Sequence, residues 1–301
     1  MKFCKHFVLS LLVLSLISLS GCVTLTHNRG ISPNNSDAYA HYCMGIIYEN
    51  KREIDKAIRE YEITIQVDRT ARRPRYILAR LYVRRGFIEQ AVEQYRILSK
   101  LDPKNTRLDT VLGALYFHQG LMYSKNGDYE QAVRSYKNLL KICRSDLGYY
   151  YLGTAYERLG KLYYAARQFN RAIKLNPDYA EAYNYLGYMY IDRAKKLDKS
   201  IKLIKKALEI EPENGYFVDS LGWGYYKKKM FEKAMFQLER AVELTKEDKD
   251  DPIIRDHLGD VYFQRKMYNK AIEQWKKAVE LGAEDRKMIE EKIKNAGGET
   301  I

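Results

Sequence analysis

Residues 146–179, DLGYYYLGTAYERLGKLYYAARQFNRAIKLNPDY, are the stretch from which the organisation of the whole chain can be understood. The first part predicts an amphipathic helix, because apolar or small residues recur three, four and seven positions apart, at Tyr149, Leu152, Gly153 and Tyr156. Gly160 ends this helix, since glycine readily adopts the left-handed conformation that closes a helix. A second helix follows with Ala165, Phe169 and Ala172 on one face, and Pro177 stops it. Such a pair leaves an apolar face uncovered, so we expect neighbouring pairs to cover it.

The stretch resembles the tetratricopeptide repeat (TPR), a helix pair of 34 residues that has an aromatic, Leu-Gly-x-x-Tyr, Gly, Ala, Phe, Ala and Pro at set offsets. The same pattern recurs in phase at residues 38–71, 72–105, 106–145, 146–179, 180–214, 215–248 and 252–285, followed by a capping helix and tail at residues 286–301. The resemblance implies an all-α fold, namely a right-handed superhelix (solenoid) of about seven TPR helix-turn-helix repeats plus a C-terminal capping helix.

Two repeats depart from the regular spacing. In the third, Gly113 and Tyr116 fit the pattern in phase with the preceding repeat, yet Gly120 and Tyr123 fit it again seven residues later. Seven residues are two helical turns, so we expect one extended first helix over residues 106–125 with its apolar face preserved. The fifth repeat has one extra residue near residues 196–199.

The N-terminus has the pattern of an export signal. Lys2 and Lys5 precede an apolar run at residues 7–20, which is shorter than the roughly 20 residues that span a bilayer. The run ends in Leu19-Ser20-Gly21-Cys22, which resembles the bacterial lipobox. That resemblance implies a signal peptide at residues 1–21 and lipidation (palmitate) at Cys22. The alternative is a chance cysteine after an apolar segment.

The residues that follow the lipobox indicate the membrane to which the protein is anchored. Val23 follows the cysteine, which resembles the class of lipoproteins sorted to the outer membrane. Residues 22–37 are rich in polar residues and include Gly30 and Pro33, and we interpret them as a flexible lipidated tether. We therefore expect a protein of the cell envelope that is lipid-anchored to the outer membrane on its periplasmic side rather than to the inner membrane.

The sequence offers no pattern for catalysis. None of the five histidines has a His, Cys or acidic residue at metal-ligand spacing, and no phosphate-binding loop or nucleophile elbow is present. We therefore predict no enzyme activity, no cofactor, no metal and no small-molecule substrate. Cys43 and Cys143 lie about three repeats apart, too far for a disulfide between them, so we expect two free thiols.

In the TPR family, fixed positions of each first helix face a concave groove. Carried over to this sequence, they give a basic set in the second repeat: Arg73, Tyr76, Arg80 and Arg84. Later repeats give a mostly aromatic set: Tyr150, Tyr151, Arg158, Asn184, Tyr185, Tyr188, Tyr216, Trp223 and Tyr226. The seventh repeat adds Asp256, Asp260 and Phe263, so we expect that end of the groove to be acidic.

This groove suits a protein segment or extended peptide that carries a carboxylate. Residues 69–85 hold seven arginines and no acid, and Arg binds carboxylates with two parallel hydrogen bonds, while Tyr offers a large contact area. The alternative is that the arginines are merely solvated and the tyrosines merely pack between repeats. A net charge of +13 could also indicate nucleic-acid binding or attraction to anionic lipid head groups, but export would remove a nucleic acid from reach.

We thus interpret the chain as a membrane-anchored periplasmic TPR scaffold that binds partner proteins or peptides through its concave groove. Residues 183–281 resemble the C-terminal repeats of adaptors that present substrates to carboxyl-terminal processing proteases (the NlpI and LbcA type). The alternative is a pilotin-like assembly lipoprotein for a type IV pilus secretin or another envelope complex. The oligomeric state does not follow from the sequence.

Overall fold

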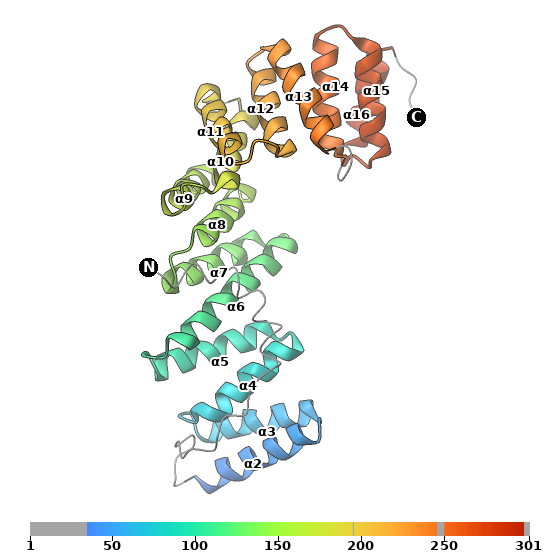
Figure 1. Ribbon diagram of the computed structural model, residues 1–301. Helices are drawn as coiled ribbons and strands as arrows, with labels where there is room; N and C mark the ends of the chain where they lie inside the picture. The colour runs from blue at the N-terminus through green and yellow to red at the C-terminus, as the bar shows by residue number, and fades with distance from the viewer. Residues whose placement is uncertain (1–34, 195, 246–249, 298–301) are drawn as a thin grey trace. The chain divides into compact units, whose positions relative to one another are not determined.

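A computed structural model describes residues 35–194, 196–245 and 250–297 of the chain (Figure 1). Within these ranges the structure has fifteen α-helices, α2 to α16, and no strand, so the predicted all-α fold is confirmed. The predicted signal peptide, the predicted lipidation residue Cys22 and most of the predicted tether lie outside the described residues. The described residues up to Lys161 form one compact unit, and those from Leu162 onward form another.

The first unit is a stack of antiparallel helix pairs. Its helices are α2 (Ser36–Asn50), α3 (Ile54–Val67), α4 (Arg72–Arg85), α5 (Ile88–Leu101), α6 (Thr106–Lys125), α7 (Tyr129–Ile142) and α8 (Asp146–Arg158). The helices α2 and α3, α4 and α5, and α6 and α7 pack as pairs, and each second helix also packs against the next first helix. Every pair therefore covers part of the apolar surface of its neighbour, as a repeat architecture requires.

The second unit follows the same plan. Its helices are α9 (Leu162–Leu175), α10 (Ala180–Asp192), α11 (Leu197–Ile210), α12 (Gly215–Lys227), α13 (Phe231–Thr245), α14 (Pro252–Gln264), α15 (Tyr268–Glu280) and α16 (Arg286–Asn295). Here α12 also contacts the first helices on both sides of it, α10 and α14. They thus form a continuous layer that can present side chains from several repeats to one ligand.

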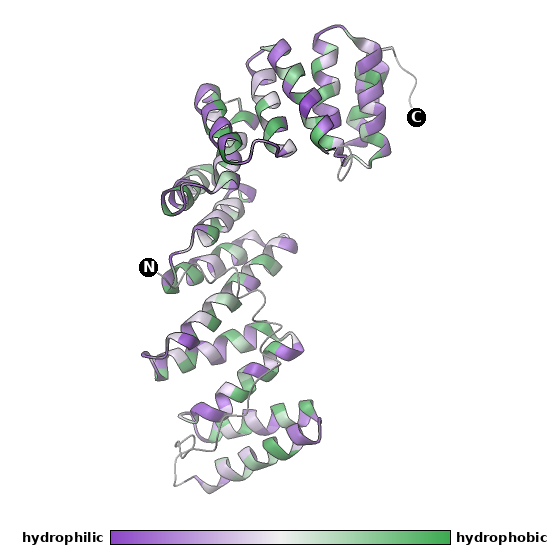
Figure 2. Cartoon of the chain, in the orientation of Figure 1, coloured by the Kyte–Doolittle hydropathy of each residue, from purple (hydrophilic) through white to green (hydrophobic). Residues whose placement is uncertain are grey.

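Small residues set the spacing between helices. An alanine at the same place of the second helix is fully buried in most repeats: Ala57, Ala91, Ala132, Ala165, Ala234 and Ala271. Each helix carries both hydrophobic and hydrophilic residues, so that one side joins the core and the other meets solvent (Figure 2). Because each helix has one hydrophobic side and one hydrophilic side, the spacing of small and aromatic residues is enough to predict the helix pairs.

Both irregular repeats behave as the sequence indicates. Helix α6 spans 20 residues, which confirms the extended first helix. The extra residue of the fifth repeat falls in the connection between α10 and α11, where Ala194 and Lys196 have φ angles of 49° and 50°. This left-handed backbone is unusual for residues other than glycine, and it lets the connection accommodate one more residue without changing the helix pairing.

The C-terminal helix α16 covers the end of the second unit. Ile289 and Ile293 are buried against the preceding core, whereas Lys287 and Lys294 are exposed. A polar outer face is what the terminal element of a repeat array requires, so the predicted capping helix is confirmed.

The cysteines agree only in part with the sequence analysis. Cys43 is a free, half-buried thiol, so no disulfide joins it to Cys143, as predicted. Cys143 is disulfide-bonded, and the prediction of a free thiol at that position is wrong. In the part of the chain that the structure describes, no helix is both long enough and apolar enough to cross a membrane.

Candidate functional site

The basic set predicted in the second repeat lies on one face of α4. The helix buries Leu78, Ala79, Leu81 and Tyr82, which fixes the direction of the remaining side chains. Residues 73, 76, 80 and 84 are three, four and four positions apart, and this spacing places them on one side of a helix. Arg73, Tyr76 and Arg84 are exposed and Arg80 is partly buried.

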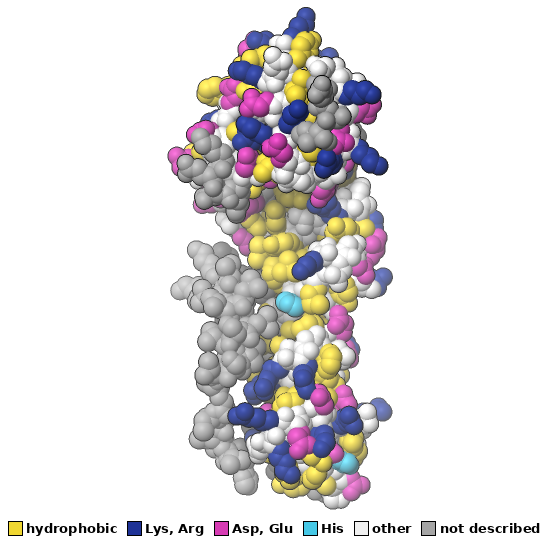
Figure 3. Space-filling view, turned by 90° about the vertical axis from the view of Figure 1, so that its right-hand side faces the viewer, with side chains coloured by type: hydrophobic (Ala, Val, Ile, Leu, Met, Phe, Trp, Pro, Cys, Tyr) yellow, Lys and Arg dark blue, Asp and Glu magenta, His cyan; other side chains and the backbone are white. Residues whose placement is uncertain are grey.

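In the described part of the chain, no carboxylate neutralises this face. Within the described residues, no ion pair or hydrogen bond joins Arg73, Arg80 or Arg84 to an acidic side chain. Tyr76 is 43% exposed and packs edge-on against Tyr95, with ring centroids 6.1 Å apart. We refer to Arg73, Tyr76, Arg80 and Arg84 as the α4 face. Figure 3 shows blue Lys and Arg side chains over the N-terminal helices, in its lower part, interspersed with yellow hydrophobic ones.

Two other arginines of this segment serve the fold. Arg85 donates to Asp55 Oδ1 on α3 at 2.6 Å. Arg75 is buried and donates to Gln94 Oε1 at 2.6 Å and to the carbonyl oxygen of Arg69 at 3.0 Å. Burial is the main cause that lowers the pKa of Arg75. The segment lacks an acid in its sequence, but the acid that binds Arg85 comes from another helix.

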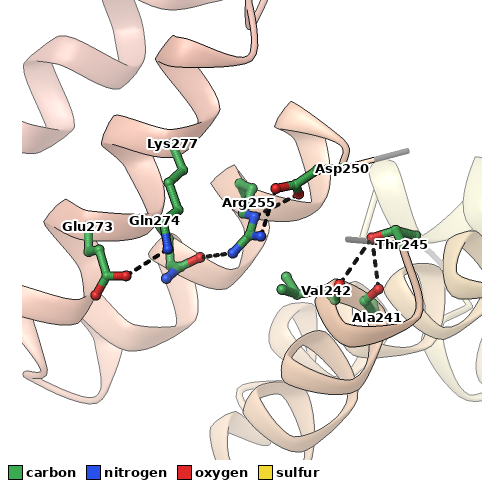
Figure 4. Close-up of polar contacts among 8 residues, drawn as sticks. All are labelled: Ala241, Val242, Thr245, Asp250, Arg255, Glu273, Gln274 and Lys277. Atoms are coloured by element: carbon green, nitrogen blue, oxygen red, sulfur yellow. Dashed lines mark hydrogen bonds and ion pairs between the residues drawn. The ribbon is translucent and has the colours of Figure 1, made fainter. Parts of the chain in front are cut away.

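An equivalent buried arginine occurs in the last repeat (Figure 4). Arg255 donates to Gln274 Oε1 at 2.7 Å and to both oxygens of Asp250 at 2.8 and 2.7 Å. Arg75 and Gln94, like Arg255 and Gln274, are 19 residues apart. The Arg–Gln pair therefore joins the first and second helices of a repeat and is not available to a ligand.

The tyrosines of helix α8 differ in how far they pack between repeats. Tyr151 stacks on Tyr136 with ring centroids 5.9 Å apart and meets Phe117 at 5.2 Å, so it packs between repeats. Tyr150 is half-buried and contacts Tyr151 edge-on at 5.3 Å. Arg158 is exposed, and its Nε lies 4.0 Å from Glu157 Oε2.

Helix α10 supplies a buried polar atom and two aromatic rings. The amide oxygen of Asn184 is buried and accepts no hydrogen bond. Tyr185 packs on Phe169 of α9 with ring centroids 5.5 Å apart. Tyr188 packs against the apolar cluster that contains Ile191 and Trp223. Both tyrosine rings thus pack within the second unit.

Trp223 lies in a stack of side chains on helix α12. Trp223 is only 9% exposed, and its ring stacks on Tyr226 at 4.6 Å and on His257 at 4.0 Å. Lys227 Nζ lies 4.5 Å from the centroid of the same ring. Three neighbours thus cover most of the indole, and the role of Trp223 in ligand binding stays a prediction. Tyr226 is partly buried by the same stack.

His257 belongs to a buried ion pair that the sequence analysis missed. Its Nδ1 lies 2.8 Å from Asp219 Oδ1, and both side chains are 9% exposed. Burial lowers the pKa of His257, but the carboxylates of Asp219, Asp256 and Asp260 outweigh burial and raise it above its ordinary value. The two partners are 38 residues apart, on first helices of successive repeats, so no local pattern indicated the pair.

At the expected acidic end of the groove, a lysine of the capping helix pairs with two carboxylates. Lys292 Nζ of α16 lies 2.7 Å from Asp256 Oδ1 and 2.7 Å from Asp260 Oδ1. Asp260 also accepts a hydrogen bond from Trp275 Nε1 at 3.2 Å. Burial and the neighbouring Asp256 raise the pKa of Asp260, and Lys292 opposes that rise. The prediction of an acidic end overlooked Lys292, which lies outside the repeats.

Comparison with known proteins agrees with this architecture. Two profiles described as tetratricopeptide repeat match the sequence, one at residues 111–176 and the other at residues 76–122 and 150–215. The chain contains tetratricopeptide repeats. The TPR fold is a scaffold suited to binding proteins or peptides.

Several curated TPR proteins are similar to part of the chain. A TPR repeat-containing protein of Pseudomonas aeruginosa is 29% identical over 121 residues, which cover 40% of this chain and 20% of that protein. The mitochondrial import receptor subunit TOM70 of Rattus norvegicus is 29% identical over 93 residues, which cover 31% of this chain and 15% of that protein. The small glutamine-rich tetratricopeptide repeat-containing protein 2 of Saccharomyces cerevisiae is 27% identical over 133 residues, which cover 44% and 38%. The chain thus spans well under half of each relative.

Solved TPR structures share the fold. A thermophilic TPR protein of Thermus thermophilus superposes with a TM-score of 0.52 at 20% identity, covering 61% of this chain and 98% of that one. A TPR protein of Parabacteroides merdae superposes with a TM-score of 0.50 at 16% identity, covering 87% and 100%. At these identities the likeness concerns the fold alone.

Proposed function

We propose that this protein is a membrane-anchored scaffold that binds partner proteins or extended peptides through the exposed faces of its first helices. The observation that carries the proposal is the α4 face, on which three arginines on one side of a helix pair with no carboxylate of the described residues. A surface of this kind attracts acidic segments, since guanidinium groups bind carboxylates with paired, charge-assisted hydrogen bonds. Tyr76 adds an exposed aromatic ring at the same place.

Helix α10 supports the peptide class of ligand. Asn184 is a partly buried amide side chain on this helix, and such a side chain can bond the backbone N–H and C=O groups that an extended peptide offers. Arginine contacts would supply charge attraction, and the Asn184 contact would fix the position of the peptide backbone. The chemistry of both faces fits a protein segment rather than a small metabolite.

The anchor is proposed from the N-terminal sequence. Signal removal before Cys22 and lipidation of Cys22 would hold the TPR array at the periplasmic side of the outer membrane. Cys22→Ser should abolish labelling with palmitate and release processed protein from the membrane fraction. Cys43→Ser is the matched control, because Cys43 is a free thiol within α2, and it should label normally. Labelling that persists in Cys22→Ser would refute the anchor.

The identity of the captured partner would distinguish a protease adaptor from a pilotin-like assembly protein. A protease adaptor should be captured with a carboxyl-terminal processing peptidase, whereas a pilotin-like protein should be captured with a secretin. The experiment is crosslinking in membranes, purification and identification by mass spectrometry, with wild type and an Arg73→Glu, Arg80→Glu, Arg84→Glu variant in parallel.

A second charge-reversed triple provides the control. Arg134, Lys137 and Lys141 lie on one exposed side of α7, in the same unit. Reversing them changes net charge equally but leaves the α4 face intact. Loss of the partner only in the α4 variant supports the proposal. Equal capture by all three proteins would contradict it.

A further inference from the structure

The outer face of α2 carries no charge, and its central residues are apolar. Ser36, Tyr39, Ala40, Cys43, Ile47 and Asn50 share this face, since their spacing places them on one side of the helix. Tyr39 is 61% exposed and Ile47 is 43% exposed. We call these six residues the α2 face. Large exposed apolar residues that gather on one helix face mark an interaction surface.

The position of α2 explains why this face is open. In the first unit, α4, α6 and α8 each pack against a second helix of the preceding repeat, but α2 packs mainly on α3. The other terminal helix, α16, exposes charged residues such as Arg286, Lys287 and Glu291. Thus one end of the described array has a polar covering helix, and the other presents the kind of apolar surface that neighbouring repeats cover elsewhere in the fold.

We infer that the α2 face pairs with the α2 face of a second copy of this chain, antiparallel and about a two-fold axis. Cys43 is the central residue of the 15-residue helix, so the axis would pass beside it. In this register Tyr39 of one copy meets Ile47 of the second, and Ser36 meets Asn50. A two-fold interface of this type uses one patch twice and closes the assembly at two copies.

The distribution of charge favours a second copy of the chain as the partner of the α2 face. The chain has a net charge of +13, so copies repel one another over much of their surface, but the α2 face brings no like charges together. Asp37 lies in the first turn of α2, and Lys51 directly follows its end. The antiparallel arrangement places Asp37 of each copy beside Lys51 of the other, and both residues are exposed.

The test is disulfide crosslinking of the full chain in membranes under mild oxidation. Wild type should form a dimer linked through Cys43, and Cys43→Ser should not. In the Cys43→Ser background, Tyr39→Cys or Ile47→Cys alone should not link, because identical positions lie about 12 Å apart along an antiparallel pair. A mixture of these two variants, carrying different tags, should link.

The matched control is Arg59→Cys on the exposed side of α3, again in the Cys43→Ser background. Linkage of Arg59→Cys to the same extent as Cys43 would indicate random collision and overturn the inference. Linkage of Tyr39→Cys to itself would overturn the antiparallel arrangement. Absence of a Cys43-linked dimer would likewise contradict the pairing.

A mass measurement provides an independent test. Sedimentation velocity of the full chain in detergent should show a dimer that dissociates on dilution, and Ile47→Lys should weaken it at least about tenfold, since the new charges would be buried against Tyr39. Phe236→Lys on α13 is the control, because Phe236 is 64% exposed and outside the α2 face. A wild-type monomer that loses binding to lipid vesicles on Ile47→Lys would show that a bilayer covers the face instead.

Discussion

The backbone of Gly45 lies so close to the ring of Tyr61 that a Cβ atom on residue 45 would be 2.6 Å from Tyr61 Cε1. The same relationship, sixteen residues apart, recurs between Gly120 and Tyr136 and between Gly259 and Trp275. A glycine on the first helix thus receives a large ring from the second helix in repeats of both units. The contact holds each pair together because the ring fills the space that a side chain would otherwise occupy.

Gly45→Val should therefore destabilise the first unit. The valine would force the fully buried Tyr61 ring to move, and overpacking of this kind costs about 1–3 kcal/mol. Urea unfolding followed by circular dichroism measures the change. Arg59→Val on the exposed side of α3 controls for the cost of a β-branched residue in a helix. An unchanged midpoint for Gly45→Val, or an equal loss in Arg59→Val, would contradict the close contact.

Trp223→Ala should destabilise the second unit rather than act on ligand binding alone. Removal of a buried tryptophan costs about 3–5 kcal/mol, since a cavity replaces its contacts with Tyr226 and His257. Tyr216→Ala on the same helix is the control, because Tyr216 is 44% exposed and its loss should change stability by less than about 0.5 kcal/mol. A stable Trp223→Ala protein, measured by thermal unfolding, would mean that the indole is not part of the core.

Lys292→Met should also destabilise the second unit, by about 1–3 kcal/mol, because it leaves Asp256 and Asp260 close together without their cation. The reporter is tryptophan fluorescence, since Trp223 and Trp275 are the only tryptophans of the sequence and both lie in this unit. Lys294→Met on the exposed side of α16 should have little effect. Adding Asp256→Asn and Asp260→Asn to Lys292→Met should restore most of the lost stability. Failure of that rescue would show that the lysine acts through packing and not through charge.

The sequence predicted contacts within a repeat better than contacts between repeats. Gly45 and Tyr61 belong to one helix pair, so their spacing recurs and can be recognised, and the long helix α6 follows from the same period. Trp223 and His257 belong to different repeats, and the position of the indole depends on residues that no local pattern connects.

Residues outside the repeat pattern were missed for the same reason. Asp256 and Asp260 fit a groove position, but Lys292 comes from the capping helix, where a repeat pattern gives no position to compare. Arg85 and Asp55 likewise pair across two repeats. The α4 face was predicted because its residues share one helix, whose exposed side follows directly from its buried one.

Charge reversal on the α4 face should change the rate of association with an acidic partner. Arg80→Glu with Arg84→Glu should slow association and reduce its dependence on salt, because exposed charges act mainly on the encounter of two molecules. Surface plasmon resonance with the captured partner measures both rates. The α7 variant Arg134→Glu with Lys137→Glu matches the change in net charge. Equal slowing in both variants would assign the effect to overall charge rather than to the α4 face.

The stability of the second unit should depend on pH through the protonation of His257. Its pKa in the folded protein is raised above the ordinary histidine value of about 6.5, because the nearby carboxylates of Asp219, Asp256 and Asp260 outweigh burial. The imidazole of His257 therefore binds its proton more strongly in the folded chain than in the unfolded chain. The resulting stabilisation is complete below about pH 6.5 and is lost as the pH rises through the higher folded pKa.

The unfolding temperature read from tryptophan fluorescence should consequently fall as the pH rises above about 6.5, until the ring of His257 is neutral in the folded state as well. His257→Gln should lower stability at acidic pH and flatten this part of the profile, and Asp219→Asn should do the same because it removes the partner at 2.8 Å. His41→Gln is the control, since His41 pairs with Glu60 in the first unit, and tryptophan fluorescence does not report on that unit. A profile that still falls in His257→Gln would assign the titration to another group and would contradict the buried imidazolium.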